Sequence, residues 1–88
     1  MERTPELGQA VKWHDPKGVE HDAIVTAVWN PTLINLVVVS KDENKRDEYG
    51  RQIERHTSQQ HASKNRVHGF YWRFADEVAN PYVAPAAV

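Results

Sequence analysis

Apolar and polar residues alternate along this chain in short runs, and this period of two restricts the possible folds more than any other feature. The runs cover residues 9–14, 21–29, 33–40, 51–58 and 68–74. In the first of them, Val11 and Trp13 fall on one face and Lys12 and His14 on the other. Because side chains alternate between the two faces of a β-strand, such runs indicate strands. The pattern predicts an all-β chain with five strands, arranged as a small antiparallel barrel or sandwich.

Turn-forming residues separate these runs. Residues 15–18 read Asp-Pro-Lys-Gly, which is the order that a type I turn favours. Pro31 has no N–H for a ladder hydrogen bond and therefore belongs to the turn between the second and third strands. Residues 41–50 are charged with both signs and residues 59–68 are polar, so both segments are expected to be exposed loops.

The third and fifth strands are the most apolar. Nearly every position of residues 33–40 is apolar, so we expect this strand to be covered on both faces, by the other side of a barrel or by a neighbouring subunit. Phe70, Trp72 and Phe74 share one face of the fifth strand and are predicted to close the core. Residues 75–79 are expected to form a short helical turn, which ends a single domain at residues 1–79.

The C-terminal segment, residues 80–88, is expected to be an extended tail, because Pro81 and Pro85 prevent a helix. Its side chains are too apolar for a freely solvated end. An extended arm laid across a neighbouring subunit would bury them. The predicted oligomer contacts are Tyr82, Val83 and Val88, and a disordered end is the alternative.

Composition excludes several classes of protein. The 88 residues include no Cys, so neither a disulfide framework nor a thiolate nucleophile is available. The longest apolar run covers residues 36–39, against about 20 residues for a membrane-spanning helix, so no membrane partner is expected. A net charge of −1 argues against a protein whose whole surface binds nucleic acid.

Neither a metal site nor catalysis is predicted. His56 and His61 are separated by an odd number of residues, so on one continuous strand they would point to opposite faces. Ser58 and His61 form no recognised nucleophile motif with any acid, and the four glycines are too scattered for a phosphate-binding loop. We therefore expect no cofactor. The one enzymatic alternative is a phosphodiesterase-like activity that uses His56 or His61 as acid or base.

Positive charge is concentrated in the second half of the predicted sheet. Residues 1–50 carry a net −3, whereas residues 51–73 carry a net +4. Arg51 and Arg55 fall on one face of the fourth strand, about 13 Å apart at 3.3 Å per residue. Guanidinium groups beside aromatic rings and hydroxyls suit a phosphate and a stacked base. The alternative is that these arginines pair with Asp47, Glu48 or Glu54 and hold the charged loop. The candidate ligand- or anion-binding residues are Arg51, Arg55, His56, Ser58, His61 and Tyr71.

Several segments together resemble a group of phage proteins. Residues 23–29 read AIVTAVW, residues 34–39 read INLVVV and residues 71–74 read YWRF, after an opening strand with Gly8 and Val11 in a Gly-x-x-Val pattern. This combination resembles small uncharacterised proteins of tailed bacteriophages, over most of residues 8–74. The resemblance implies an SH3-like β-barrel that is present in the host bacterial cytoplasm during infection or in the virion. It assigns no activity, so it transfers no catalytic residue.

Three hypotheses of function follow. The first is a non-enzymatic homo-oligomeric binding module, a virion or virion-assembly accessory that contacts capsid or connector proteins. The second is an anti-defence protein that binds and sequesters a small nucleotide signal of the host. The third is a single-stranded nucleic-acid binder, a role that small barrels often have.

Overall fold

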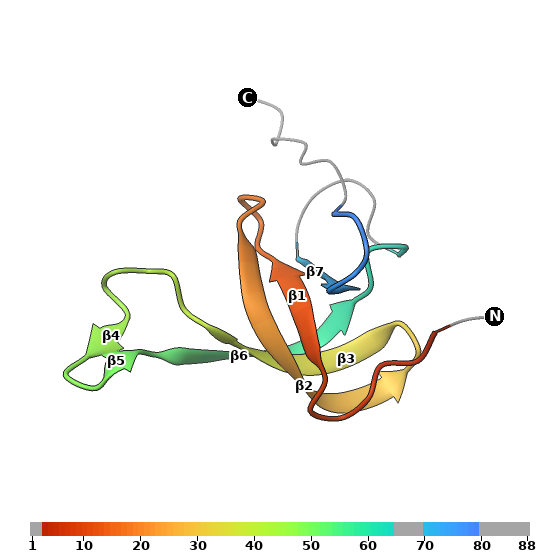
Figure 1. Cartoon of the computed structure of the whole chain (residues 1–88), viewed down its shortest axis with the longest axis horizontal. Coiled ribbons are helices and arrows are strands. Elements are labelled where there is room, and N and C mark those ends of the chain that lie inside the picture. Colours follow the sequence, from red (N-terminus) through yellow and green to blue (C-terminus); the bar gives the residue numbers. More distant parts are fainter. Residues whose placement is uncertain (1–2, 65–69, 80–88) are drawn as a thin grey trace.

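The computed structural model describes residues 3–64 and 70–79, and every regular element in them is a β-strand. Five strands form one sheet in the order β6-β3-β2-β1-β7, with antiparallel pairing throughout (Figure 1). Two further strands, β4 and β5, form a separate two-stranded sheet. This confirms the predicted all-β chain with a five-stranded antiparallel sheet. The strands are β1 (Ala10–His14), β2 (Glu20–Asn30), β3 (Leu33–Val39), β4 (Arg46–Asp47), β5 (Gly50–Arg51), β6 (Ile53–Gln60) and β7 (Tyr71–Phe74).

The sheet bends round on itself but is not closed into a barrel (Figure 1). Its edge strands β6 and β7 approach at one point, where His61 forms a single parallel bridge with Trp72. There the N–H of Ala62 donates to the carbonyl of Trp72 at 2.9 Å. Because β7 has only four residues, it cannot form a ladder along the eight residues of β6.

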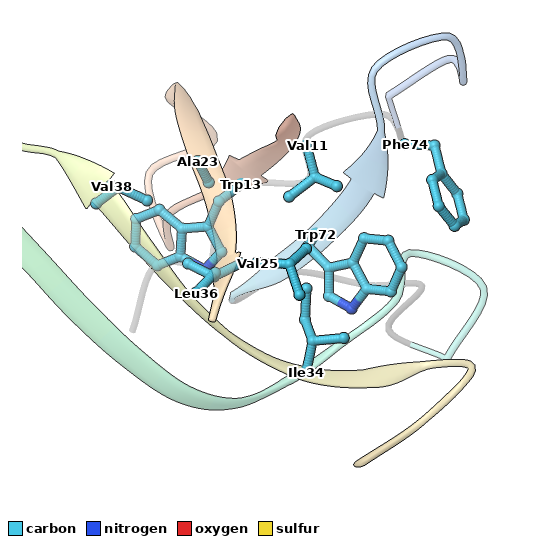
Figure 2. Close-up of a cluster of buried hydrophobic side chains, with 9 residues drawn as sticks. All are labelled: Val11, Trp13, Ala23, Val25, Ile34, Leu36, Val38, Trp72 and Phe74. Carbon is cyan, nitrogen blue, oxygen red and sulfur yellow. The ribbon is translucent and has the colours of Figure 1, made fainter. Parts of the chain in front are cut away.

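The core fills the concave side of the bent sheet (Figure 2). Trp72 and Ile34 are completely buried, and the indole N–H of Trp72 donates to the carbonyl of Thr32 at 3.0 Å. Alternate residues of each long strand supply the remaining side chains, as the period of two predicts. The cluster consists of Val11, Trp13, Ala23, Val25, Ile34, Leu36, Val38, Trp72 and Phe74.

The two apolar strands differ from the predictions. Within this chain β3 is covered on one face only: Leu36 and Val38 are buried, whereas Val37 is half-buried and Val39 is 52% exposed. The other side of the sheet therefore does not cover the second face of β3, and coverage by a neighbouring subunit stays a prediction. Phe70 does not join Trp72 and Phe74 in closing the core. It precedes β7 and is 46% exposed.

The charged connection is also more ordered than predicted. Residues 40–52 form an arm that projects from the body of the molecule and has β4 and β5 at its tip (Figure 1). As a result the predicted strand 51–58 is interrupted at Gln52, and β6 runs on to Gln60. Where the sequence predicted a helical turn at residues 75–79, the chain makes a hydrogen-bonded turn from Phe74 to Glu77, too short for a helix.

Both short turns are confirmed. The N–H of Gly18 donates to the carbonyl of Asp15 at 2.9 Å, and Gly18 has the positive φ of 81° that glycine tolerates best. At the next turn, the side chain of Asn30 accepts hydrogen bonds from the N–H groups of Thr32 and Leu33. The predicted tail, residues 80–88, and with it Tyr82, Val83 and Val88, lies outside the described residues.

Two tryptophans provide a matched test of this core. Trp72→Ala should lower the free energy of unfolding by about 3–5 kcal/mol, because it empties a fully buried site at the point where the sheet edges meet. Trp29→Ala removes an indole that is 61% exposed, and should cost less than about 1 kcal/mol. Urea denaturation followed by circular dichroism measures both values. Equal losses would contradict the assignment of Trp72 to the core.

Candidate functional site

One end of the bent sheet carries an open hollow of about 720 Å³. The turn between β1 and β2, the base of the arm and the inward face of β6 surround it. This volume lies within the range of small-molecule sites, which are often found at the mouths of barrels. The hollow is therefore the first candidate for a functional site.

Trp13 provides the apolar wall of the hollow. Its indole is 3% exposed and stacks on the imidazole of His56, with ring centroids 4.2 Å apart and an interplanar angle of 17°. The ring of Phe70 also stacks on Trp13, at 5.5 Å and 18°. Directly across from Trp13 in the ladder lies His21, with its ring tilted at 5.1 Å. β1, β2 and β6 thus supply three rings of one cluster, and Phe70, just before β7, supplies the fourth.

One ring nitrogen of His21 has a hydrogen-bond partner, and the other has none among the described residues. Its Nε2 lies 3.0 Å from Oδ2 of Asp15, whose other oxygen accepts the N–H groups of Lys17 and Val19. Burial alone would raise the pKa of Asp15, but these hydrogen bonds, with that from His21 foremost, outweigh it and lower the pKa. The ionised carboxylate accepts only, so Nε2 of His21 carries the proton. The Nδ1 atom is buried and has no hydrogen-bond partner among the described residues.

His56, on β6, also has a ring nitrogen without a hydrogen-bond partner among the described residues. Its Nε2 is buried without a hydrogen-bond partner in the described part of the chain, and the nearest carboxylate oxygen, on Glu54, is 3.8 Å away. Burial is the main cause that lowers the pKa of His56, and the nearby His21 adds to it. The ring is therefore neutral at pH 7. Two unsatisfied imidazole nitrogens in one hollow call for a bound molecule or water.

The charges around the hollow are balanced. Lys45 pairs with Glu54 at 3.3 Å, and a hydrogen bond from Ser40 is the main cause that lowers the pKa of Glu54. The hollow therefore has no excess of either charge. Its charged lining residues are Lys17, Lys41 and Lys45 against Asp15, Asp42 and Glu54.

The structure does not bring the two predicted arginines to this hollow. Arg51 lies in the arm, where its guanidinium pairs with Glu43 at 2.5 Å, an acid that was not among its predicted partners. Arg55 is exposed and sits between the two inward residues Glu54 and His56 of β6, so it faces outward. Of the six predicted ligand residues, His56 lines the hollow.

The other three predicted residues lie elsewhere. Ser58 has a φ of 53°, and its N–H donates to Oδ1 of Asn35 at 2.8 Å. Tyr71 stacks on His14 at 4.5 Å and 8°, on the face of β1 opposite Trp13. His61 lies at the closing point of the sheet. The six residues therefore do not form one site.

His61 belongs to a hydrogen-bonded chain that includes a serine and an acid. Its Nε2 lies 2.7 Å from Oε1 of Glu77, and its Nδ1 lies 2.9 Å from Oγ of Ser63. The backbone N–H of Ser63 also donates to Nδ1 at 3.1 Å, which occupies the lone pair that a general base would use. Glu77 in turn accepts the N–H of Phe74 at 2.8 Å. These hydrogen bonds connect the turn that contains Ser63 to the turn that contains Glu77, which is a structural role.

A buried arginine is the feature that sequence reasoning missed most completely. Arg73 is 8% exposed; its Nε donates to Nε2 of His14 at 3.2 Å, and it also contacts Glu20 and the carbonyl of Glu77. Burial, and after it the Arg73 charge, lowers the pKa of His14. Alternation gives Arg73 the opposite parity to Trp72 and Phe74 along the fifth strand, which does not indicate its burial. His21 was also missed, although it shares the parity of Ala23 and Val25 along β2, which was the available signal.

The outer face of the sheet carries a second, apolar groove of about 350 Å³. Three exposed side chains of β2, β3 and β6 line it: Ile24 is 49%, Val39 is 52% and Ile53 is 68% exposed. Lys12 and Asp22, an ion pair between neighbouring strands, lie at its edge. The lining offers almost no hydrogen-bonding group, which suits an apolar surface better than a polar metabolite.

Comparisons with protein-family models, curated protein sequences and solved structures found no match. Within residues 3–64 and 70–79, no helix is long and apolar enough to cross a membrane. The same residues contain no group of three or more His, Asp or Glu side chains placed to hold a metal ion. A conclusion about function therefore rests on the geometry of this chain alone.

The lowered pKa values of His14 and His56 predict a loss of stability as the pH falls from about 7 to 5. The unfolded chain binds protons near the ordinary histidine value of about 6.5, whereas the folded chain keeps both rings neutral to lower pH. The unfolded state therefore binds more protons in this window, and stability is lost as the pH decreases through it. Urea unfolding at several pH values measures the slope.

His14→Gln provides the matching control, because the amide oxygen of glutamine can accept the Arg73 hydrogen bond without titrating. The slope between pH 7 and 5 should be shallower in this variant than in the wild type. Identical slopes would show that His14 is not kept neutral by the fold.

Proposed function

We propose that this chain is a non-enzymatic binding protein that captures a small planar molecule in the hollow at the end of its sheet. The observation that carries the proposal is the combination of the Trp13 stack with two buried, unsatisfied imidazole nitrogens, on His21 and His56. Small-molecule sites typically combine an apolar, aromatic wall with a few fixed polar groups. This hollow has both.

The polar groups of the hollow are arranged to hold a molecule. Asp15 is fixed by three hydrogen bonds, from His21, Lys17 and Val19. His56 is held flat against Trp13. A rigid wall loses little conformational entropy on binding, which favours affinity. The proposal corresponds to the second sequence hypothesis, the sequestration of a small host molecule, and the phage resemblance would place that activity in the host cytoplasm during infection.

Neighbouring residues of β6 provide the test. His56→Ala removes the ring that stacks on Trp13 and should weaken the binding of planar aromatic fragments at least tenfold, in a screen followed by NMR chemical shifts. Arg55→Ala changes the next residue, which faces away from the hollow, and should leave binding unchanged. If both variants, each shown to be folded, lost binding equally, or if no aromatic fragment shifted the Trp13 resonances, the proposal would be wrong.

The apolar outer groove favours a second candidate function, self-association as an accessory protein of the phage particle. Ile24, Val39 and Ile53 expose apolar surface beside a cation and an anion, Lys12 and Asp22. A patch with both charges can match a second copy of itself across a twofold axis. A dimer or larger ring could then contact capsid or connector proteins through its remaining surface.

We also propose that the sheet is an SH3-like barrel that is closed at one point only. Two observations support this proposal. The edge strands of the β6-β3-β2-β1-β7 sheet meet at the bridge between His61 and Trp72, and the concave face holds one continuous core. Such a barrel leaves one end open, which is where the hollow lies.

Self-association has a separate test. Ile24→Glu and Ile53→Glu each place a charge in the groove and should shift an oligomer to monomers in analytical ultracentrifugation. Thr57→Glu adds the same charge to the same outer face, about 13 Å along β6 from Ile53, and should leave the oligomer intact. A wild-type protein that is monomeric at hundreds of micromolar would contradict this second function.

A further inference from the structure

The two unsatisfied nitrogens and the neutral lining of the hollow restrict the chemistry of its ligand. We infer that the ligand is an uncharged, planar nitrogen heterocycle that donates an N–H to Nδ1 of His21, as a nucleobase or nucleoside does. This inference rests on the proposed function, and it names the class of molecule that the hollow takes. Three separate observations support it.

The first observation is the direction of the hydrogen bond that His21 lacks. Because the Asp15 carboxylate fixes a proton on Nε2, the Nδ1 atom of an imidazole with a single proton presents a lone pair. A buried acceptor of this kind costs free energy until a donor reaches it. The ligand must therefore bring an N–H or O–H group. His21 lines the hollow but its Nδ1 atom is itself buried, so the ring has to shift toward the hollow for a donor to reach it.

The second observation is the shape of the wall. His56 and Phe70 each lie nearly parallel to the Trp13 indole, at 17° and 18°, and are tilted by 32° to each other. Phe70 lines the hollow and is 46% exposed. Flat rings stack on such a surface, and every nucleobase has a π-face that can do so. A flexible aliphatic ligand would leave the stacking surface unused.

The third observation is the charge balance. Three lysines line the hollow, but so do three carboxylates, and Lys45 is already paired with Glu54 at 3.3 Å. A bound phosphate, with a charge of about −2, would lie beside the carboxylates of Asp42 and Glu54. None of the described arginines lines the hollow to compensate for this repulsion. An uncharged ring fits this environment better than a nucleotide. The two sequence-predicted arginines would have changed that balance, but neither lines the hollow.

Two substitutions of His21 separate its contact with a ligand from its structural role. In His21→Gln the amide reaches the position of Nε2, so it keeps the Asp15 contact and loses the Nδ1 acceptor. In His21→Asn the amide reaches the position of Nδ1, so the acceptor is kept and the Asp15 contact is lost. The probes are adenosine, guanosine, cytidine and uridine, each titrated by NMR and calorimetry, with the 5′-monophosphate of the nucleoside that binds best.

At least one nucleoside should bind the wild-type protein, and its monophosphate should bind no more tightly. His21→Gln should weaken that binding at least tenfold while its melting temperature stays near the wild-type value. His21→Asn should melt at a lower temperature yet keep more of the binding than His21→Gln. No binding by any of the four nucleosides, tighter binding of the monophosphate, or equal affinities of His21→Gln and the wild type would each overturn the inference.

The inference and the proposed function fail in different ways. If aromatic fragments bind the hollow and depend on His56, but no nucleoside does, the proposed function stands and the assignment to this ligand class is wrong. If neither fragments nor nucleosides bind, both are wrong, and the unsatisfied nitrogens are satisfied by water only. The Arg55→Ala control applies to both experiments, because Arg55 lies on the outward face of β6.

Discussion

The burial of Trp72 is the interaction on which the rest of this structure depends. Its indole is completely buried, its N–H is bonded to the carbonyl of Thr32 at 3.0 Å, and its backbone carbonyl accepts the N–H of Ala62 at 2.9 Å. These contacts join the last strand to the far edge of the sheet. Without them a five-stranded sheet of this length would be an open layer with a single exposed apolar face. They bend the sheet around its core instead.

The single closing point explains why the molecule has an open end. Among the described residues β6 and β7 meet only near Trp72, and none of their strands lies opposite the inward face of β6 beyond that point. His56 lies on that face and stacks on Trp13 rather than on a neighbouring strand. The open end, and with it the hollow, is thus a consequence of one short strand.

The sequence was sufficient to predict the strands but not the site. Alternation identified the all-β chain, and the turns at residues 15–18 and 30–32 were predictable because Asp, Pro, Gly and Asn act locally. The candidate ligand residues were chosen from a charged stretch, and the fold separates them: Arg51 lies on the arm and His61 at the closing point. The His21–Asp15 pair and the buried Arg73 depend on packing between strands, which a period of two cannot indicate.

The most direct test of the account is to locate a bound aromatic molecule by intermolecular nuclear Overhauser effects. With an aromatic ligand at saturating concentration, the account predicts contacts from its ring protons to the rings of Phe70, His56 and Trp13, which form the stacked group. Contacts to Ile24 and Ile53 instead would assign binding to the outer groove. Contacts to neither surface would contradict the claim that the open end of the sheet is a binding site.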